Sequence, residues 1–177
     1  PISSTGLSWS LLKMTTSMAI SAGEKMPQGS LTVMGKSGPE SLSTDELFAG
    51  KKVVLISVPG AFTPTCSMSH LPGFVDNADK IMSKGVDTIA CMAVNDVFVM
   101  KAWGIDQKVG DKVLMLADGN ADYTKALGLE LDATTFGMGV RGQRFAIIVE
   151  DGVATHVAVE DPASFDVSRA ESVLNVL

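Results

Sequence analysis

The sequence predicts a three-layer α/β domain built on a mixed β-sheet. Apolar runs of strand length alternate with segments that carry helix signals through most of the chain. Two further apolar runs, 145–150 and 153–159, flank Asp151-Gly152 and predict a β-hairpin. Alternating strands and helices place helices on both faces of a sheet, and the hairpin adds antiparallel strands to it.

Local signals fix several element boundaries. Ser43 followed by Glu46 resembles a capping box, Asn95-Asp96 can cap a helix, and Gly85 is a usual helix end. The expected strands lie at 31–34, 53–58, 86–94, 113–117, 145–150 and 153–159. The expected helices lie at 43–48, 67–84, 95–107, 120–128 and 168–177.

Residues 1–22 differ in composition from the rest and are expected to be a loosely ordered leader. They are rich in Ser and Thr, contain no acid and carry one basic residue, Lys13. Two interpretations stay open: the remainder of an organellar transit peptide, or an artificial extension ahead of an internal start such as Met14 or Met18. Residues 23–177 are then one domain. The expected location is cytoplasmic, or plastid or mitochondrion if the leader is native, and not secreted.

Composition narrows the function classes. The 177 residues are 46% hydrophobic and 19% charged, which is ordinary for a compact fold. The net charge of -6 argues against nucleic-acid binding, and no apolar run approaches the ~20 residues that span a bilayer. Two cysteines without a CxxC pair, and two distant histidines, favour single-thiol chemistry over a disulfide framework or a metal site.

Cys66 is the principal candidate for chemistry. It lies between a buried strand and a helix, so it meets the unpaired N–H groups of a first helical turn, which favour thiolate. Pro59 and Pro64 stiffen the loop before it, and Gly60 allows close backbone approach. Pro64 also keeps Thr63 out of the helical region, so that its hydroxyl can lie beside the sulfur. These residues specify a pocket, which a buried structural thiol would not need.

Four other residues are candidates for the site, and each also has a possible structural role. Cys91 lies in an apolar strand, where core packing is favoured over redox chemistry. Arg144 precedes the core strand 145–150 and is expected to lie over the Cys66 pocket, whereas Arg141 fits a solvated strand end. His70 follows Cys66 by about one helical turn. It is expected either to line the pocket or to be an ordinary first-turn residue.

These motifs resemble those of a known family. Pro59-Gly60-Ala61-Phe62-Thr63-Pro64-Thr65-Cys66, followed by His70-Leu71-Pro72-Gly73-Phe74, is similar to the active-site signature of the peroxiredoxins, specifically the atypical type II (peroxiredoxin five) subfamily. The resemblance covers roughly residues 23–177. Further agreement comes from Val94–Met100, Trp103, Leu116–Gly119, Leu127–Leu129 and Arg141–Phe145.

The resemblance implies a thioredoxin-like fold and a thiol-dependent reduction of hydrogen peroxide and organic hydroperoxides. Cys66 matches the peroxidatic cysteine, and Thr63 matches the threonine that hydrogen-bonds thiolate and peroxide. Pro59 matches the proline that shields the sulfur, and Arg144 matches the pocket arginine. Gly60 and His70 are expected to complete the pocket.

The resemblance also implies partners. Glutathione with glutaredoxin, or thioredoxin, is the expected reductant, a homodimer is the expected assembly, and no metal, haem or flavin is required. Some relatives carry a resolving cysteine near the C-terminus, but 164–168 contains none. Cys91 matches a second cysteine of many relatives. We therefore expect a one-cysteine cycle, with a Cys66–Cys91 disulfide as the alternative.

Other protein classes remain as alternatives. A redox sensor would use the same Cys66 chemistry to pass oxidation to a partner protein. A thioredoxin-like binding module is disfavoured by the complete pocket, and a thioredoxin-type disulfide reductase by the absence of CxxC.

Overall fold

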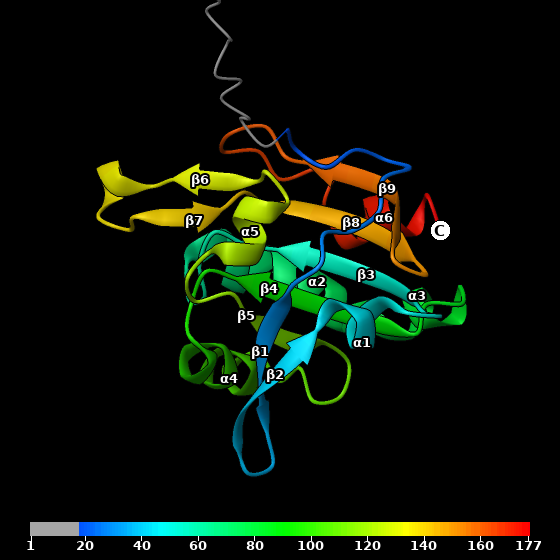
Figure 1. Cartoon of the computed structure of the whole chain (residues 1–177), viewed down its shortest axis with the longest axis horizontal. Helices are drawn as coiled ribbons and strands as arrows, with labels where there is room; N and C mark the ends of the chain where they lie inside the picture. Colours follow the sequence, from blue (N-terminus) through cyan, green and yellow to red (C-terminus); the bar gives the residue numbers. More distant parts are fainter. Residues whose placement is uncertain (1–17) are drawn as a thin grey trace, which may run out of the picture.

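The computed structural model describes residues 18–177, and in this part of the chain a seven-stranded sheet runs through the domain (Figure 1). The strand order is β2-β1-β5-β4-β3-β8-β9, and a separate small sheet pairs β6 with β7. The strands are β1 (Ser30–Gly35), β2 (Gly38–Ser43), β3 (Lys52–Ser57), β4 (Thr88–Ala93), β5 (Leu114–Ala117), β6 (Glu130–Asp132), β7 (Val140–Gly142), β8 (Phe145–Glu150) and β9 (Val153–Val159).

The seven-stranded sheet is mixed, as expected. Strands β3, β4 and β5 are parallel to one another, whereas the β1–β2, β1–β5, β3–β8 and β8–β9 pairs are antiparallel. The predicted hairpin is present, and both turn residues, Asp151 and Gly152, have positive φ angles of 47° and 78°. Such a turn matches the twist of the flanking strands.

Helices cover both faces of the sheet, so the predicted three-layer arrangement is confirmed. The strands alternate: Val54 and Ile56 of β3 pack with one core cluster, and Val53 and Leu55 with the other. Helices α2, α3, α4 and α6 contribute to the first cluster, α1 and α5 to the second. Their bounds are α1 (Thr44–Phe48), α2 (Leu71–Asp76), α3 (Ala78–Ser83), α4 (Val97–Asp106), α5 (Asp122–Ala126) and α6 (Ala170–Leu174).

Two of the helix caps follow the sequence signals. The Ser43 side chain accepts a hydrogen bond from the Glu46 N–H at the start of α1. Asp96 does the same for the Val99 N–H at the start of α4. Asn95 is not part of this cap, because its side chain bonds to the loop before Cys66.

The single helix expected over 67–84 is wrong in detail. A π-helix occupies Cys66–His70, α2 follows it, and a break at Asn77 separates α2 from α3. Pro72 has no N–H to donate and crowds the preceding turn, which explains the wider helical turn before it. At the break, the Asn77 side chain donates to the Gly73 carbonyl at 2.8 Å, an alternative to continued helix.

Three short strands were missing from the prediction. Strand β2 is an edge strand with Pro39 and mostly polar, exposed residues, so it lacks an apolar signal. Strands β6 and β7 have three residues each, and a 3₁₀ turn at Thr134–Phe136 lies between them. The last helix, α6, is also shorter than the expected 168–177.

Residues 1–17, most of the expected leader, lie outside the described residues. Ile20 is buried, and its N–H donates to the Leu127 carbonyl at 2.9 Å. Packing of the domain therefore begins a few residues before the expected boundary at 23. In residues 18–177 no helix has the length and apolar character that crossing a bilayer requires.

The topology brings two distant segments together. The loop that leads to Cys66 leaves the end of β3, and Ser57 at that end pairs with Phe145 at the start of the antiparallel β8. Arg144 directly precedes Phe145. The sheet therefore places Arg144 beside the Cys66 loop despite their separation in sequence.

Candidate active site

Cys66 lies in the first turn of the helical segment that begins at Pro64, and it is fully buried. The Arg144 Nη2 group donates a hydrogen bond to its sulfur at 3.1 Å. The Arg144 guanidinium is therefore in direct contact with the sulfur, at the start of a helical segment. The fold brings Arg144 into contact with Cys66, as the sequence predicts.

His70 belongs to the same site rather than to an ordinary first turn. It is fully buried, with Nδ1 lying 2.8 Å from Arg144 Nη1 and Nε2 lying 3.0 Å from the Ser168 carbonyl oxygen. Because a carbonyl only accepts, Nε2 carries the proton and Nδ1 accepts from Arg144. Burial, followed by the Arg144 charge, lowers the pKa of His70 from 6.5 to about 3, so the ring is neutral.

The loop before Cys66 is tightly packed around Gly60. A Cβ at this residue would lie 3.1 Å from Thr63 Cγ2, 3.2 Å from Arg141 Nη1 and 3.3 Å from Met138 Cε. The Thr63 hydroxyl donates to the Gly60 carbonyl at 2.7 Å, and the Asn95 side chain accepts from the Ala61 N–H. Thr63 thus shapes the loop without capping the helix, and its oxygen lone pairs stay available as acceptors.

Arg141 is more than the solvated strand end that was expected. It is half-buried, and its Nε donates to the Met138 carbonyl at 2.9 Å, which places the guanidinium beside Gly60. Pro59 is half-buried in the same loop. Phe62 is 53% exposed with a φ of 63°, a strained conformation for a residue with a side chain.

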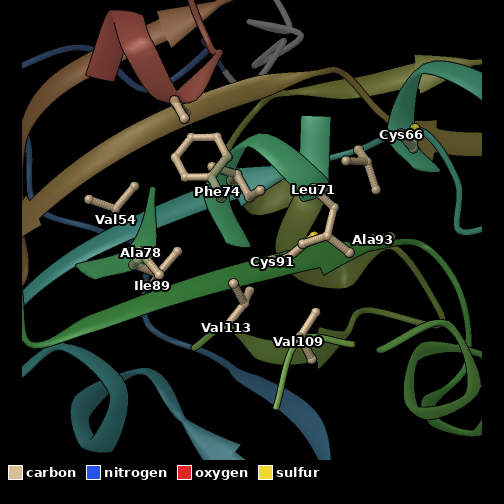
Figure 2. Packing of buried hydrophobic residues seen from close by; sticks show 14 of the residues in the cluster. Val54, Cys66, Leu71, Phe74, Ala78, Ile89, Cys91, Ala93, Val109 and Val113 are labelled. Atoms are coloured by element: carbon tan, nitrogen blue, oxygen red, sulfur yellow. The ribbon is translucent and has the colours of Figure 1, made fainter. Parts of the chain in front are cut away.

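Cys91 lies on β4 in the core cluster that also contains Cys66, and Figure 2 shows the two residues on different elements. It is fully buried. Burial, followed by the charge of Cys66, raises the pKa of the Cys91 thiol well above its ordinary value. These surroundings agree with the packing role favoured from the sequence.

A cavity of about 420 Å³ lies next to Arg144. Its exposed wall surface is mostly apolar, with Leu131, Phe136 and Phe165 as the large apolar residues, and its polar residues include Arg144 and Glu160. Sequence patterns did not single out these three apolar residues. They come from β6, the 3₁₀ turn and the loop after β9, which converge only in the folded chain.

Phe165 also contacts the polar groups of the site, and Glu160 is a further residue that no sequence pattern singled out. The Phe165 ring lies 5.8 Å from the Arg144 guanidinium carbon and 5.2 Å from the His70 ring. Glu160 accepts hydrogen bonds from the segment that supplies the Ser168 carbonyl. Contacts to backbone groups leave no residue pattern in the sequence.

In residues 18–177 no group of three or more His, Cys, Asp or Glu residues could hold a metal ion.

Comparisons with known proteins agree with this geometry. The sequence model of the Redoxin family matches residues 21–174. Peroxiredoxin-2E, chloroplastic, from Arabidopsis thaliana is 45% identical over 163 residues, which are 90% of this chain and 70% of the relative.

Solved structures give the same result. Reduced Prx3 from Vibrio vulnificus in complex with hydrogen peroxide is 54% identical, with a TM-score of 0.86 over 89% of this chain and 98% of that one. A Plasmodium falciparum antioxidant protein, a 1-Cys peroxiredoxin, is 31% identical, with a TM-score of 0.83 over 89% and 98% of the two chains. The chain therefore belongs to the peroxiredoxins, in the type II group with a thioredoxin-like fold, and is a thiol-dependent peroxidase.

Proposed function

We propose that Cys66 is the residue that reduces the hydroperoxide. The observation that carries this proposal is the 3.1 Å hydrogen bond from Arg144 to a buried sulfur in a first helical turn. The thiolate attacks the terminal peroxide oxygen, the O–O bond breaks, and an alcohol or water leaves after taking a proton. The sulfur is oxidised to a sulfenic acid.

Ionisation alone does not account for fast peroxide reduction. An ordinary cysteine thiol is about 3% ionised at neutral pH, so full ionisation gains at most about 30-fold. Further acceleration requires groups that stabilise the charge developing on the two peroxide oxygens. Arg144, the Thr63 oxygen and the first-turn N–H groups are the candidates, with Pro59 and Gly60 shaping the loop.

The reductive half follows a one-cysteine cycle. Glutathione condenses with the sulfenic acid, releasing water and leaving a mixed disulfide, and a second thiol, from glutathione or glutaredoxin, restores Cys66. Thioredoxin is the alternative reductant. Burial of Cys91 within β4 supports this cycle, because a Cys66–Cys91 disulfide would require local unfolding of the core.

The cavity beside Arg144 supports organic hydroperoxides as substrates in addition to hydrogen peroxide. Its volume of about 420 Å³ and its apolar walls of Leu131, Phe136 and Phe165 suit an alkyl or aryl group. Arg144, which donates to the sulfur, is one of the polar residues of the same cavity, together with Gln143 and Glu160.

A homodimer fits the exposed apolar residues around the site. Phe62, Met68, Phe98 and Phe136, which we call the apolar rim, are 53%, 78%, 65% and 80% exposed. Exposed apolar groups gathered in this way mark interaction surfaces. The similarity to a chloroplastic relative supports an organellar location.

The decisive experiment is mass spectrometry after one equivalent of peroxide, with and without glutathione. We expect a sulfenic acid at Cys66 and, with glutathione, a Cys66 adduct. The Cys66→Ser variant should stay folded and consume no peroxide, whereas Cys91→Ala should keep turnover with glutathione and glutaredoxin. Peroxide turnover by Cys66→Ser would contradict the proposal, and a Cys66–Cys91 disulfide would replace the one-cysteine cycle.

A further inference from the structure

Glu160 follows β9 and is almost completely buried, with 8% of its surface exposed. Its carboxylate accepts hydrogen bonds from the N–H groups of Asp166, Val167 and Ser168 at 2.6, 3.0 and 3.3 Å. It also accepts one from the Ser168 hydroxyl at 2.8 Å. One carboxylate therefore holds the backbone of 166–168 in place.

The segment that Glu160 holds is connected to the sulfur. The Ser168 carbonyl accepts from His70 Nε2, His70 Nδ1 accepts from Arg144, and Arg144 donates to Cys66. Each link is 2.8–3.1 Å long. These hydrogen bonds, together with the backbone of Ser168, connect Glu160 to the reacting atom.

The carboxylate is charged in this position. Burial acts to raise the pKa of Glu160, but the hydrogen bonds from 166–168 outweigh it and hold the pKa below its ordinary value. The charged form is the better acceptor for several N–H groups. The Glu160 N–H in turn donates to the Arg144 carbonyl at 3.0 Å, so the backbones of the two residues are also joined.

We propose that Glu160 is a positioning residue for Arg144, acting through Ser168 and the tautomer of His70. This inference rests on the proposed role of Cys66 as the attacking thiolate. A fixed Ser168 carbonyl keeps the proton on His70 Nε2, which leaves Nδ1 as an acceptor for the guanidinium. If the Ser168 carbonyl were not fixed, His70 could adopt the tautomer with its proton on Nδ1. That N–H would point at the Arg144 guanidinium and displace the guanidinium from the sulfur.

The test compares Glu160→Gln with Glu150→Gln. Both remove one carboxylate from the β8–β9 region, but Glu150 lies at the exposed end of β8, where it forms an ion pair with Lys52. Glu160→Gln should slow oxidation of Cys66 by hydrogen peroxide about ten-fold or more, because small displacements of a charge-stabilising donor are costly. Glu150→Gln should react at the wild-type rate.

Nitrogen NMR of labelled histidine reports which nitrogen of His70 carries the proton. A purely structural role of Glu160 would not change this tautomer. Wild-type His70 should show a protonated Nε2 and an unprotonated Nδ1, and Glu160→Gln should show a mixture of tautomers. His156 is the internal reference, and a His70→Gln spectrum assigns the two rings. A slower rate with an unchanged His70 tautomer would overturn the inference, and so would an unchanged rate.

Ser168→Ala provides a milder test if Glu160→Gln does not fold. It removes one of the four bonds to Glu160 but keeps the carbonyl, so both the rate and the tautomer should change in the same direction by less. Wild-type values of both would overturn the inference. Failure of the proposed function appears differently, as peroxide turnover in Cys66→Ser, whatever Glu160→Gln does.

Discussion

At the residue scale, burial turns His70 from a titrating side chain into a neutral hydrogen-bonding group. Both ring nitrogens are engaged, one with Ser168 and one with Arg144, and the depressed pKa keeps the ring neutral. Its titration therefore cannot control activity near neutral pH. A neutral ring is needed here because an imidazolium would offer no acceptor to the guanidinium.

Because the His70 ring must stay neutral in the fold, acidification should lower the free energy of unfolding. In the unfolded chain His70 has an ordinary pKa of 6.5, whereas in the fold it has a pKa of about 3. Between these values the unfolded state binds more protons, so the free energy of unfolding falls as pH decreases. Urea titrations from neutral pH to about pH 4 should show a steeper loss for wild type than for His70→Gln. Parallel losses would contradict the assignment.

Thr63 makes a second prediction at this scale. Its hydroxyl proton is committed to the Gly60 carbonyl, which leaves the oxygen as an acceptor for a hydroperoxide O–H. Thr63→Val should therefore slow peroxide attack by about a hundred-fold, while Thr63→Ser stays near wild type. Stopped-flow oxidation rates test this, with ultraviolet absorbance reporting the thiolate fraction. If Thr63→Val changed only the thiolate fraction, the proposed role of the Thr63 oxygen as an acceptor for the peroxide would be wrong.

The candidate residues of the site differ in how clearly the sequence marks them. Cys66, Thr63 and Arg144 stand in motifs whose residue types are diagnostic, and the β3–β8 register brings them together. Glu160 and Ser168 act through backbone groups, which any residue supplies and which leave no pattern in the chain. Arg141 was underestimated because its packing on Gly60 depends on the β6–β7 hairpin, which was not predicted.

At the scale of elements, long buried strands and the capped helix starts were predictable, because apolar runs and cap residues are local signals. The break of 67–84 into a π-helix and two α-helices was not. It depends on a balance between helix continuation, the missing N–H of Pro72 and a side-chain bond from Asn77. The π-helix also places Ser67, whose hydroxyl accepts from Trp103 Nε1 at 3.0 Å and ties α4 to this segment.

Strand β7 offers a test of element packing near the site. A Cβ at Gly142 would lie 2.9 Å from Ser57 Oγ, and that hydroxyl is buried without a hydrogen-bond partner in the part of the chain described. Gly142→Ala should therefore cost about 1–3 kcal/mol of unfolding free energy. Ser57→Ala should be neutral or stabilising, because no hydrogen bond is lost.

The double variant Ser57→Ala/Gly142→Ala shows which neighbour causes the loss of stability in Gly142→Ala. If the Ser57 hydroxyl is the obstacle, Ser57→Ala should recover part of the loss from Gly142→Ala, giving a coupling of about 0.5 kcal/mol or more in urea unfolding. Additive effects would instead place the strain at Thr124, the next neighbour at 3.4 Å.

At the scale of the whole molecule, the residues of the apolar rim belong to segments that adjoin the active site. Phe62 follows Ala61, which is bonded to Asn95, and Phe98 is in the first turn of the helix that Asn95 precedes. Met68 belongs to the π-helix of Cys66, and Phe136 lines the cavity beside Arg144. The surface proposed for the dimer therefore consists of residues that adjoin the active site in the chain or line its cavity.

Charge placed on this surface should separate the subunits. Phe98→Glu changes an exposed residue that contacts neither the sulfur nor the cavity, and burying its carboxylate between two copies would cost several kcal/mol unless it were paired. Sedimentation velocity should show a wild-type dimer and a Phe98→Glu monomer at the same concentration. The control is Met82→Glu, a 41%-exposed residue on α3, which leads to the start of β4 and away from the Cys66 loop. Because this control adds the same charge elsewhere, a dimer that survives Phe98→Glu, or one that is lost equally in both variants, would exclude the apolar rim as the interface.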